Sequence, residues 1–175
     1  GFPTYGGLAG RDLEAIAQPR EPASAHWMTV QDLCARRLTE LGFTVERHAY
    51  GSGVNVVGVR EGSAEPARRV VVGAHYDHIR NCAGADDNAS GVAGALEVAR
   101  VLARRSYPRT LVVALWDEEE RGLVGSRAYA MRARSRAETI DAYFNFEMIG
   151  YVDRSPGSQR LPTGFGLIFA AAARE

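Results

Sequence analysis

The sequence is poor in cysteine, has no lysine and carries no net charge. Its 175 residues include two cysteines, Cys34 and Cys82, which are too few for a disulfide framework and lack the C-x-x-C spacing of a cysteine zinc motif. We expect two free thiols rather than one bridge. Because 21 arginines balance 21 acidic residues, the net charge favours neither nucleic acid nor an anionic membrane as a partner.

Long apolar runs are also missing. No segment approaches the roughly 20 apolar residues that span a bilayer, and no charged-then-apolar signal region opens the chain. We therefore expect no membrane-spanning segment. The first residue is Gly1 rather than Met, so we expect that the natural start has been removed, which is compatible with a lost export signal.

The apolar residues that are present predict one α/β domain over residues 1–175. Helical spacing predicts helices at 25–41, with Gly42 as a C-cap, at 88–105, with Asp87 or Asn88 as N-cap, and at 123–134. Short apolar runs predict strands at 54–59, 69–74, 110–116 and 142–149. This alternation favours helices packed on a largely parallel sheet.

Residues that can bind a metal ion follow the predicted strands. His75 ends one apolar run, the acidic stretch 117–120 follows another, and Glu147 lies near the end of the last. Asp87 lies where a loop enters a helix. In open α/β sheets the ligand site lies beyond the carboxyl ends of the strands, so these groups should converge there.

The composition of this group favours a divalent cation. Crowded carboxylates repel one another and stay charged away from water only beside compensating positive charge. Imidazole with carboxylate, without cysteine, suits a catalytic zinc ion, although manganese or cobalt would accept the same ligands. A bridging carboxylate such as Asp87 would allow two ions roughly 3.5 to 4 Å apart.

Four motifs, in this order, resemble bacterial members of the M28 family of zinc aminopeptidases: GAHYDHI, GADDNASGVAGALEVARVL, EERGLVGS and NFEMIGY. The match runs from about Val54 to Leu161. The resemblance implies a three-layer α/β sandwich of the zinc-peptidase and phosphorylase-like type, with a central, mostly parallel mixed sheet flanked by helices. It also implies a zinc exopeptidase with two Zn²⁺ ions and a peptide substrate that has a free N-terminus.

The resemblance further implies a role for each site residue. His75 and Glu147 would bind the first zinc ion, although the best-known members carry Asp at the position of Glu147. Glu120 would bind the second ion, and Asp87 would bridge the two. Glu119 would be the general base, and Asp77 would orient the imidazole of His75.

One part of the family pattern is missing from the sequence. The family takes a further zinc-binding histidine from a segment well after the fourth predicted strand, and the chain stops at Glu175. The stretch SQRLPTGFGLIF resembles the loop that leads into that segment. We therefore expect the chain to be the N-terminal portion of a longer enzyme, with the fifth ligand beyond Glu175.

Several of these residues also have structural interpretations. The acidic stretch could be a solvated turn, and we expect Asp117 and Glu118 to be structural. Asp87 could cap a helix, which is compatible with binding a metal. We expect Asp86 to support the site from behind, and His78 to line the cleft or bond to the loop rather than bind a metal.

Other functions remain open at this point. Within the same fold the alternatives are a glutaminyl cyclase or a carboxypeptidase-type zinc enzyme. From other classes, the alternatives are a non-catalytic binding module and an inactive fragment. The oligomeric state is open, and because bacterial relatives are often exported we expect a secreted or periplasmic location.

Overall fold

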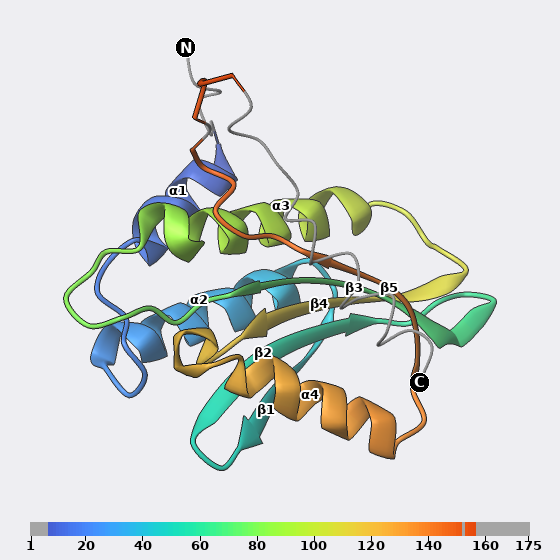
Figure 1. Cartoon of the computed structure of the whole chain (residues 1–175). Coiled ribbons are helices and arrows are strands. Elements are labelled where there is room, and N and C mark those ends of the chain that lie inside the picture. Colours follow the sequence, from blue (N-terminus) through green and yellow to red (C-terminus); the bar gives the residue numbers. More distant parts are fainter. Residues whose placement is uncertain (1–6, 152, 157–175) are drawn as a thin grey trace.

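The computed structural model describes residues 7–151 and 153–156 (Figure 1). Its helices and strands follow one another along the chain as α1 (Leu8–Ile16), α2 (Ala25–Glu40), β1 (Thr44–Tyr50), β2 (Gly53–Arg60), β3 (Glu65–His75), η1 (Ala85–Ser90), α3 (Gly91–Leu102), β4 (Arg109–Trp116), η2 (Glu119–Arg121), α4 (Val124–Ser135) and β5 (Thr139–Asn145).

The five strands form one mixed sheet in the order β1-β2-β4-β3-β5. Strand β3 runs parallel to both β4 and β5, whereas the pairs β1–β2 and β2–β4 are antiparallel. His75, the last residue of β3, pairs with Trp116, the last residue of β4. The carboxyl ends of β3, β4 and β5 therefore meet at one edge of the sheet, as the sequence predicted.

Helices cover both faces of this sheet, which confirms the predicted α/β fold class. Figure 1 shows α3 on one side of the sheet and α4 on the other. One core joins α1, α2 and α3 to the sheet, and its members include Ile16, Leu38, Val56, Leu96 and Leu115. A smaller core lies under α4, and its members include Val57, Val112, Ala114 and Tyr129. Successive strand residues face opposite sides of the sheet, and both sides are covered by helices, so the buried part of β3 at 71–74 is apolar at every position.

Most predicted elements are present with shifted ends. The first predicted helix is α2, and Gly42 follows it with a positive φ, as a C-cap requires. The prediction of a helix over 88–105 was wrong at both ends, because α3 spans Gly91–Leu102 and the irregular turn η1 precedes it. Asn88, one of the two predicted N-caps, has non-helical φ and ψ and accepts the backbone N–H of Gly91 at 3.0 Å with Oδ1, which is a capping bond, so the prediction is confirmed for Asn88.

Two further differences concern strands. Strand β5 ends at Asn145, so Glu147 lies in the segment after the strand rather than inside it. Strand β1 was not predicted, because His48 is its only buried residue and the strand has no apolar alternation. Helix α1 was not predicted either.

Cys34 is buried and Cys82 is partly exposed, and both are free. In the described part of the chain, every helix is too short or too polar to cross a bilayer. The stretch SQRLPTGFGLIF lies outside the described residues.

Arg20 ties the segment between α1 and α2 to the loop that follows β3. Its side chain is fully buried, and the guanidinium donates to the backbone carbonyls of Tyr76 at 2.7 Å, Ala83 at 2.6 Å and Gly84 at 2.8 Å. It also donates to the carbonyl of Asp87 at 3.3 Å. One side chain thus fixes both ends of the loop from 76 to 87.

We predict that Arg20→Met lowers the free energy of unfolding by about 3 kcal/mol, because several buried carbonyls lose a charged donor. Urea denaturation followed by circular dichroism measures this change. The control is Arg80→Met, whose side chain is 81% exposed and lies 3.7 Å from Glu21. We expect the control to change stability by less than about 0.5 kcal/mol. Equal effects of the two substitutions would contradict the anchoring role of Arg20.

Candidate metal centre

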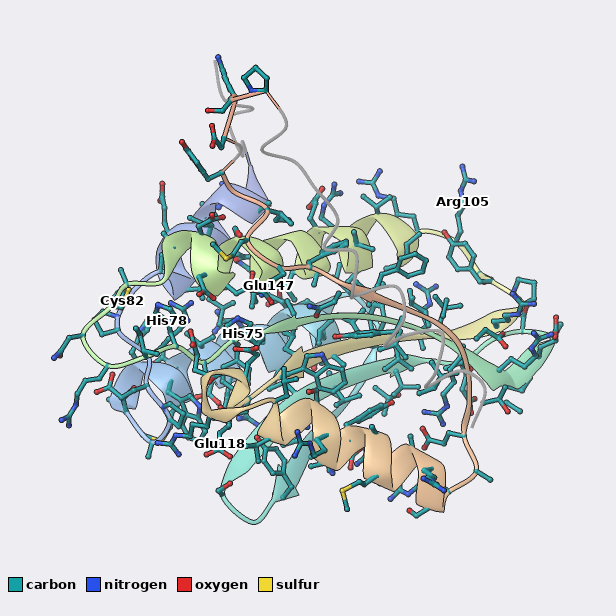
Figure 2. All side chains as sticks on the ribbon, in the orientation of Figure 1. His75, His78, Cys82, Arg105, Glu118 and Glu147 are labelled. Carbon is teal, nitrogen blue, oxygen red and sulfur yellow. The ribbon has the colours of Figure 1, made fainter. Side chains whose placement is uncertain are left out.

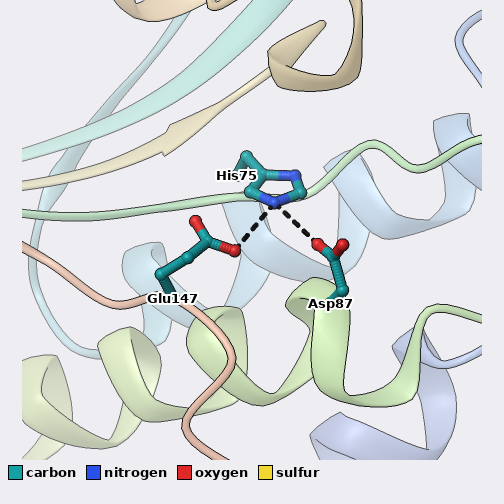
Figure 3. Close-up of side chains that lie close together, drawn as sticks. All are labelled: His75, Asp87 and Glu147. Atoms are coloured by element: carbon teal, nitrogen blue, oxygen red, sulfur yellow. Dashed lines mark hydrogen bonds and ion pairs between the residues drawn. The ribbon is translucent and has the colours of Figure 1, made fainter. Parts of the chain in front are cut away.

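His75 lies at the centre of a group of carboxylates beyond the ends of the parallel strands. Its imidazole is almost fully buried, and Nε2 lies 3.1 Å from Oδ1 of Asp87 and 3.2 Å from Oε1 of Glu147 (Figure 3). These two carboxylates come from η1 and from the segment after β5. Three distant parts of the chain therefore direct ligand-type atoms at one point.

The surroundings of His75 favour positive charge. Burial by itself lowers the pKa of His75, but the carboxylates of Asp77 and Glu147 outweigh burial and raise this pKa to about 10. The same negative field would stabilise a metal cation. Because a metal-bound imidazole must be neutral, an ion would compete with the proton for Nε2.

Asp77 connects His75 to the turn after β4. Its buried carboxylate accepts the backbone N–H groups of Glu119 at 3.0 Å and Glu120 at 3.3 Å. Nδ1 of His75 lies 3.2 Å from the backbone oxygen of Asp77 and 3.5 Å from its Oδ1. Asp77 thus lies on the predicted side of the imidazole, and the nearer acceptor is its backbone carbonyl.

The acidic stretch after β4 divides into a buried half and an accessible half. Asp117 accepts from Trp27 Nε1 at 2.8 Å and from the backbone N–H of Val54 at 2.9 Å, and burial raises its pKa to about 6. Glu118 is equally buried and accepts from Arg121 at 2.7 Å. These contacts agree with the structural role predicted for Asp117 and Glu118.

Glu119 and Glu120 form the accessible half and face the two histidines. Oε2 of Glu119 lies 4.0 Å from Nε2 of His75, and its side chain is about one-third exposed. Partial burial raises the pKa of Glu119, and Glu147 and Glu120 add to this rise while His75 opposes it. Oε1 of Glu120 lies 2.7 Å from Nδ1 of His78.

The DDNASG motif positions the segment that carries Glu147. Asn88 donates from Nδ2 to the carbonyl of Phe146 at 2.8 Å and accepts the N–H of Met148 at 3.2 Å. It therefore fixes the backbone on both sides of Glu147. Asp86 accepts the N–H of Gly150 at 2.7 Å, which agrees with its predicted supporting place.

The structure brings all six predicted site residues together. Two overlapping groups have their ligand-type atoms within 4.8 Å of one another: His75, Asp87 and Glu147, and His78, Asp87 and Glu120. Zinc bonds of 2.0 to 2.2 Å in a tetrahedron separate ligand atoms by about 3.3 Å. The 3.1 and 3.2 Å separations around His75 are close to this value, so these residues fit a zinc ion.

Sequence reasoning missed two residues that position the site. Nothing in the sequence distinguishes Arg20 from the other arginines, because its partners are backbone carbonyls. Asn88 was predicted as a helix cap and does make a capping bond to Gly91, but its bonds to the segment that carries Glu147 were not predicted. Figure 2 shows the labelled His75, His78 and Glu147 near one another, with Arg105 well away from them.

Curated relatives match part of this chain. A probable zinc metalloprotease from Leptosphaeria maculans is 35% identical over 104 residues, which are 55% of this chain and 24% of the relative. An aminopeptidase from Pseudomonas aeruginosa is 43% identical over 86 residues, which are 49% of this chain and 16% of the relative. The chain thus spans about a quarter or less of the length of these relatives.

A solved structure and a family profile also match this chain. The crystal structure of LapB from Legionella pneumophila superposes with a TM-score of 0.73 at 24% identity, over 83% of this chain and 44% of that one. At this identity the likeness shows the fold alone. Residues 55–170, about two-thirds of the chain, match the profile of peptidase family M28. The chain therefore belongs to peptidase family M28.

Proposed function

We propose that the described residues belong to the catalytic domain of a zinc-dependent aminopeptidase that uses two metal ions. One observation carries this proposal: separate elements bring together two groups of ligand-type side chains, one with His75 and Glu147 and one with Glu120, and Asp87 belongs to both. Membership of family M28 and the names of the matched relatives support the same reading.

Four residues would hold the ions. His75 and Glu147 would hold the first, Glu120 would hold the second, and Asp87 would contribute to both. Bound divalent ions supply Lewis acidity, which makes water more acidic and polarises a carbonyl group. Asp77 links His75 to the turn after β4. Its carboxylate contacts the imidazole of His75 and accepts the backbone N–H groups of Glu119 and Glu120.

We assign the proton transfers of the proposed reaction to Glu119. Its carboxylate is partly exposed, lies beside His75 and makes no contact as close as the 2.7 Å contact of Glu120 with His78. In the proposed reaction Glu119 accepts a proton from the attacking water and donates it to the leaving amine of the substrate. This is the general-base role that the family resemblance implies.

We predict that Glu119→Gln lowers kcat by about 10³-fold, because the amide cannot accept the proton, while the metal content stays unchanged. Steady-state kinetics of the active enzyme and elemental analysis measure the two quantities. Glu61→Gln on the exposed surface removes the same charge and is the matched control. Near-normal turnover with retained metal would show that Glu119 is not the base.

We predict that Asn88→Asp weakens zinc binding about 10- to 100-fold, because it removes the donor to Phe146 and leaves Glu147 poorly held. Competition with a chromophoric chelator measures the affinity. Asn81→Asp adds the same charge at an exposed position and serves as control. The positioning role fails if both variants bind zinc equally well.

The substrate class is tested by a panel of peptides. We expect cleavage of aminoacyl amides and of peptides with a free N-terminus, and no cleavage of N-terminally blocked peptides. Ring closure of N-terminal glutaminyl peptides would instead identify a glutaminyl cyclase. Release of residues from the C-terminus would identify a carboxypeptidase.

A further inference from the structure

Asn55 is a fully buried polar residue of β2 that the proposed reaction does not use. Its Oδ1 accepts the backbone N–H of Asp117 at 3.0 Å, and its Nδ2 donates to the backbone carbonyl of Gly125 at 2.8 Å. These two partners are the ends of the turn that follows β4, residues 117–125. One side chain therefore bonds to both ends of the turn that carries Glu119 and Glu120.

The position of Asn55 requires an acceptor and a donor on the same short side chain. A carboxylate there would set a second acceptor against the carbonyl of Gly125, and an apolar side chain would leave buried N–H and C=O groups unpaired. Nδ2 also lies 3.1 Å from Nδ1 of His48, and burial lowers the pKa of His48, so a neutral imidazole can accept the second amide hydrogen. These partners fix the amide in one orientation.

The backbone of the turn is strained and depends on contacts from outside it. Glu118 and Leu123, which lie on either side of Glu119 and Glu120, have left-handed conformations with φ of +52° and +61°. Residues with a Cβ atom rarely adopt these angles, which persist only where surrounding contacts impose them. The bonds from Asn55 hold the two ends of the turn and so impose this conformation.

We propose that Asn55 is a positioning residue for the metal centre, because it fixes the turn that carries Glu119 and Glu120. This inference rests on the proposed function, since it assigns a role at the same two-ion site. Asp77 accepts the two N–H groups in the middle of the turn, whereas Asn55 holds its ends. Asn55 acts through this backbone and belongs to neither group of ligand-type side chains.

The contact between Asn55 and the turn leaves no space for a further side chain. A Cβ atom at Gly125 would overlap Oδ1 of Asn55 and the backbone carbonyl oxygen of Asp117. Gly125→Ala would therefore separate the amide from the turn while Asn55 itself stays unchanged. Two different substitutions, Asn55→Ala and Gly125→Ala, thus remove the same contact, and either one tests the inference if the other does not fold.

The first test is amide hydrogen exchange of the chain, which needs neither metal nor activity. We predict that Asn55→Ala and Gly125→Ala speed exchange at the amides of Glu119 and Glu120 by about 10-fold or more, while the amides of β4 stay protected. The control is Val57→Ala, because Val57 is also buried, lies on the same face of β2 and packs in the smaller core under α4. Equal protection of the turn in all three folded variants would overturn the inference.

The second test separates positioning of the site from a loss of general stability. We predict that Asn55→Ala weakens binding of one of two zinc ions about 10-fold, as measured by competition with a chromophoric chelator. In the active enzyme it should lower kcat about 10²-fold and leave KM unchanged, because the base is misplaced. Val57→Ala lowers stability without touching the turn and should change neither quantity. Asn55→Ala with the zinc affinity and kcat of this control would show that Asn55 is only structural.

These measurements distinguish failure of this inference from failure of the proposed function. If the unmodified chain binds no zinc, the two-ion function is wrong, and the role of Asn55 at that site is wrong with it. If the unmodified chain binds two ions and folded Asn55→Ala binds both equally tightly, the function stands and only the assignment of Asn55 falls.

Discussion

Repulsion between carboxylates is the constraint on which this structure depends. Five carboxylates gather around His75 and His78 at one edge of the sheet: Asp77, Asp87, Glu119, Glu120 and Glu147. Without compensating positive charge, such a cluster would disfavour its own folded arrangement. A bound cation would reverse the sign of this contribution, so the same groups that repel one another would hold the segments together.

Hydrogen bonds from side chains to the backbone hold this cluster in place. Asn88 binds the backbone on both sides of Glu147, and Asp77 binds the backbone of Glu119 and Glu120. Arg20 approaches from behind and binds the carbonyls of the loop between His75 and Asp87. The site is therefore positioned mainly by side chains that form hydrogen bonds to the backbone. The carboxylates of Asp87, Glu120 and Glu147 remain available to bind an ion.

The sequence predicts those parts of the structure in which the type of residue depends on its surroundings, such as apolar residues in a buried strand. Strands β2 and β4 and the second half of β3 were predicted because both of their faces are largely buried, so these stretches are mostly apolar. Strand β1 was missed because His48 is its only buried residue. His75 and the carboxylates were found from strand ends and motifs. Arg20 was not, because backbone carbonyls as partners leave no trace in the sequence.

The most direct test is anomalous X-ray scattering at the zinc absorption edge, from crystals of the chain grown with zinc. The account predicts one anomalous peak between His75, Asp87 and Glu147, and a second beside Asp87 and Glu120. A folded chain with no peak within bonding distance of His75, at saturating zinc, would contradict it.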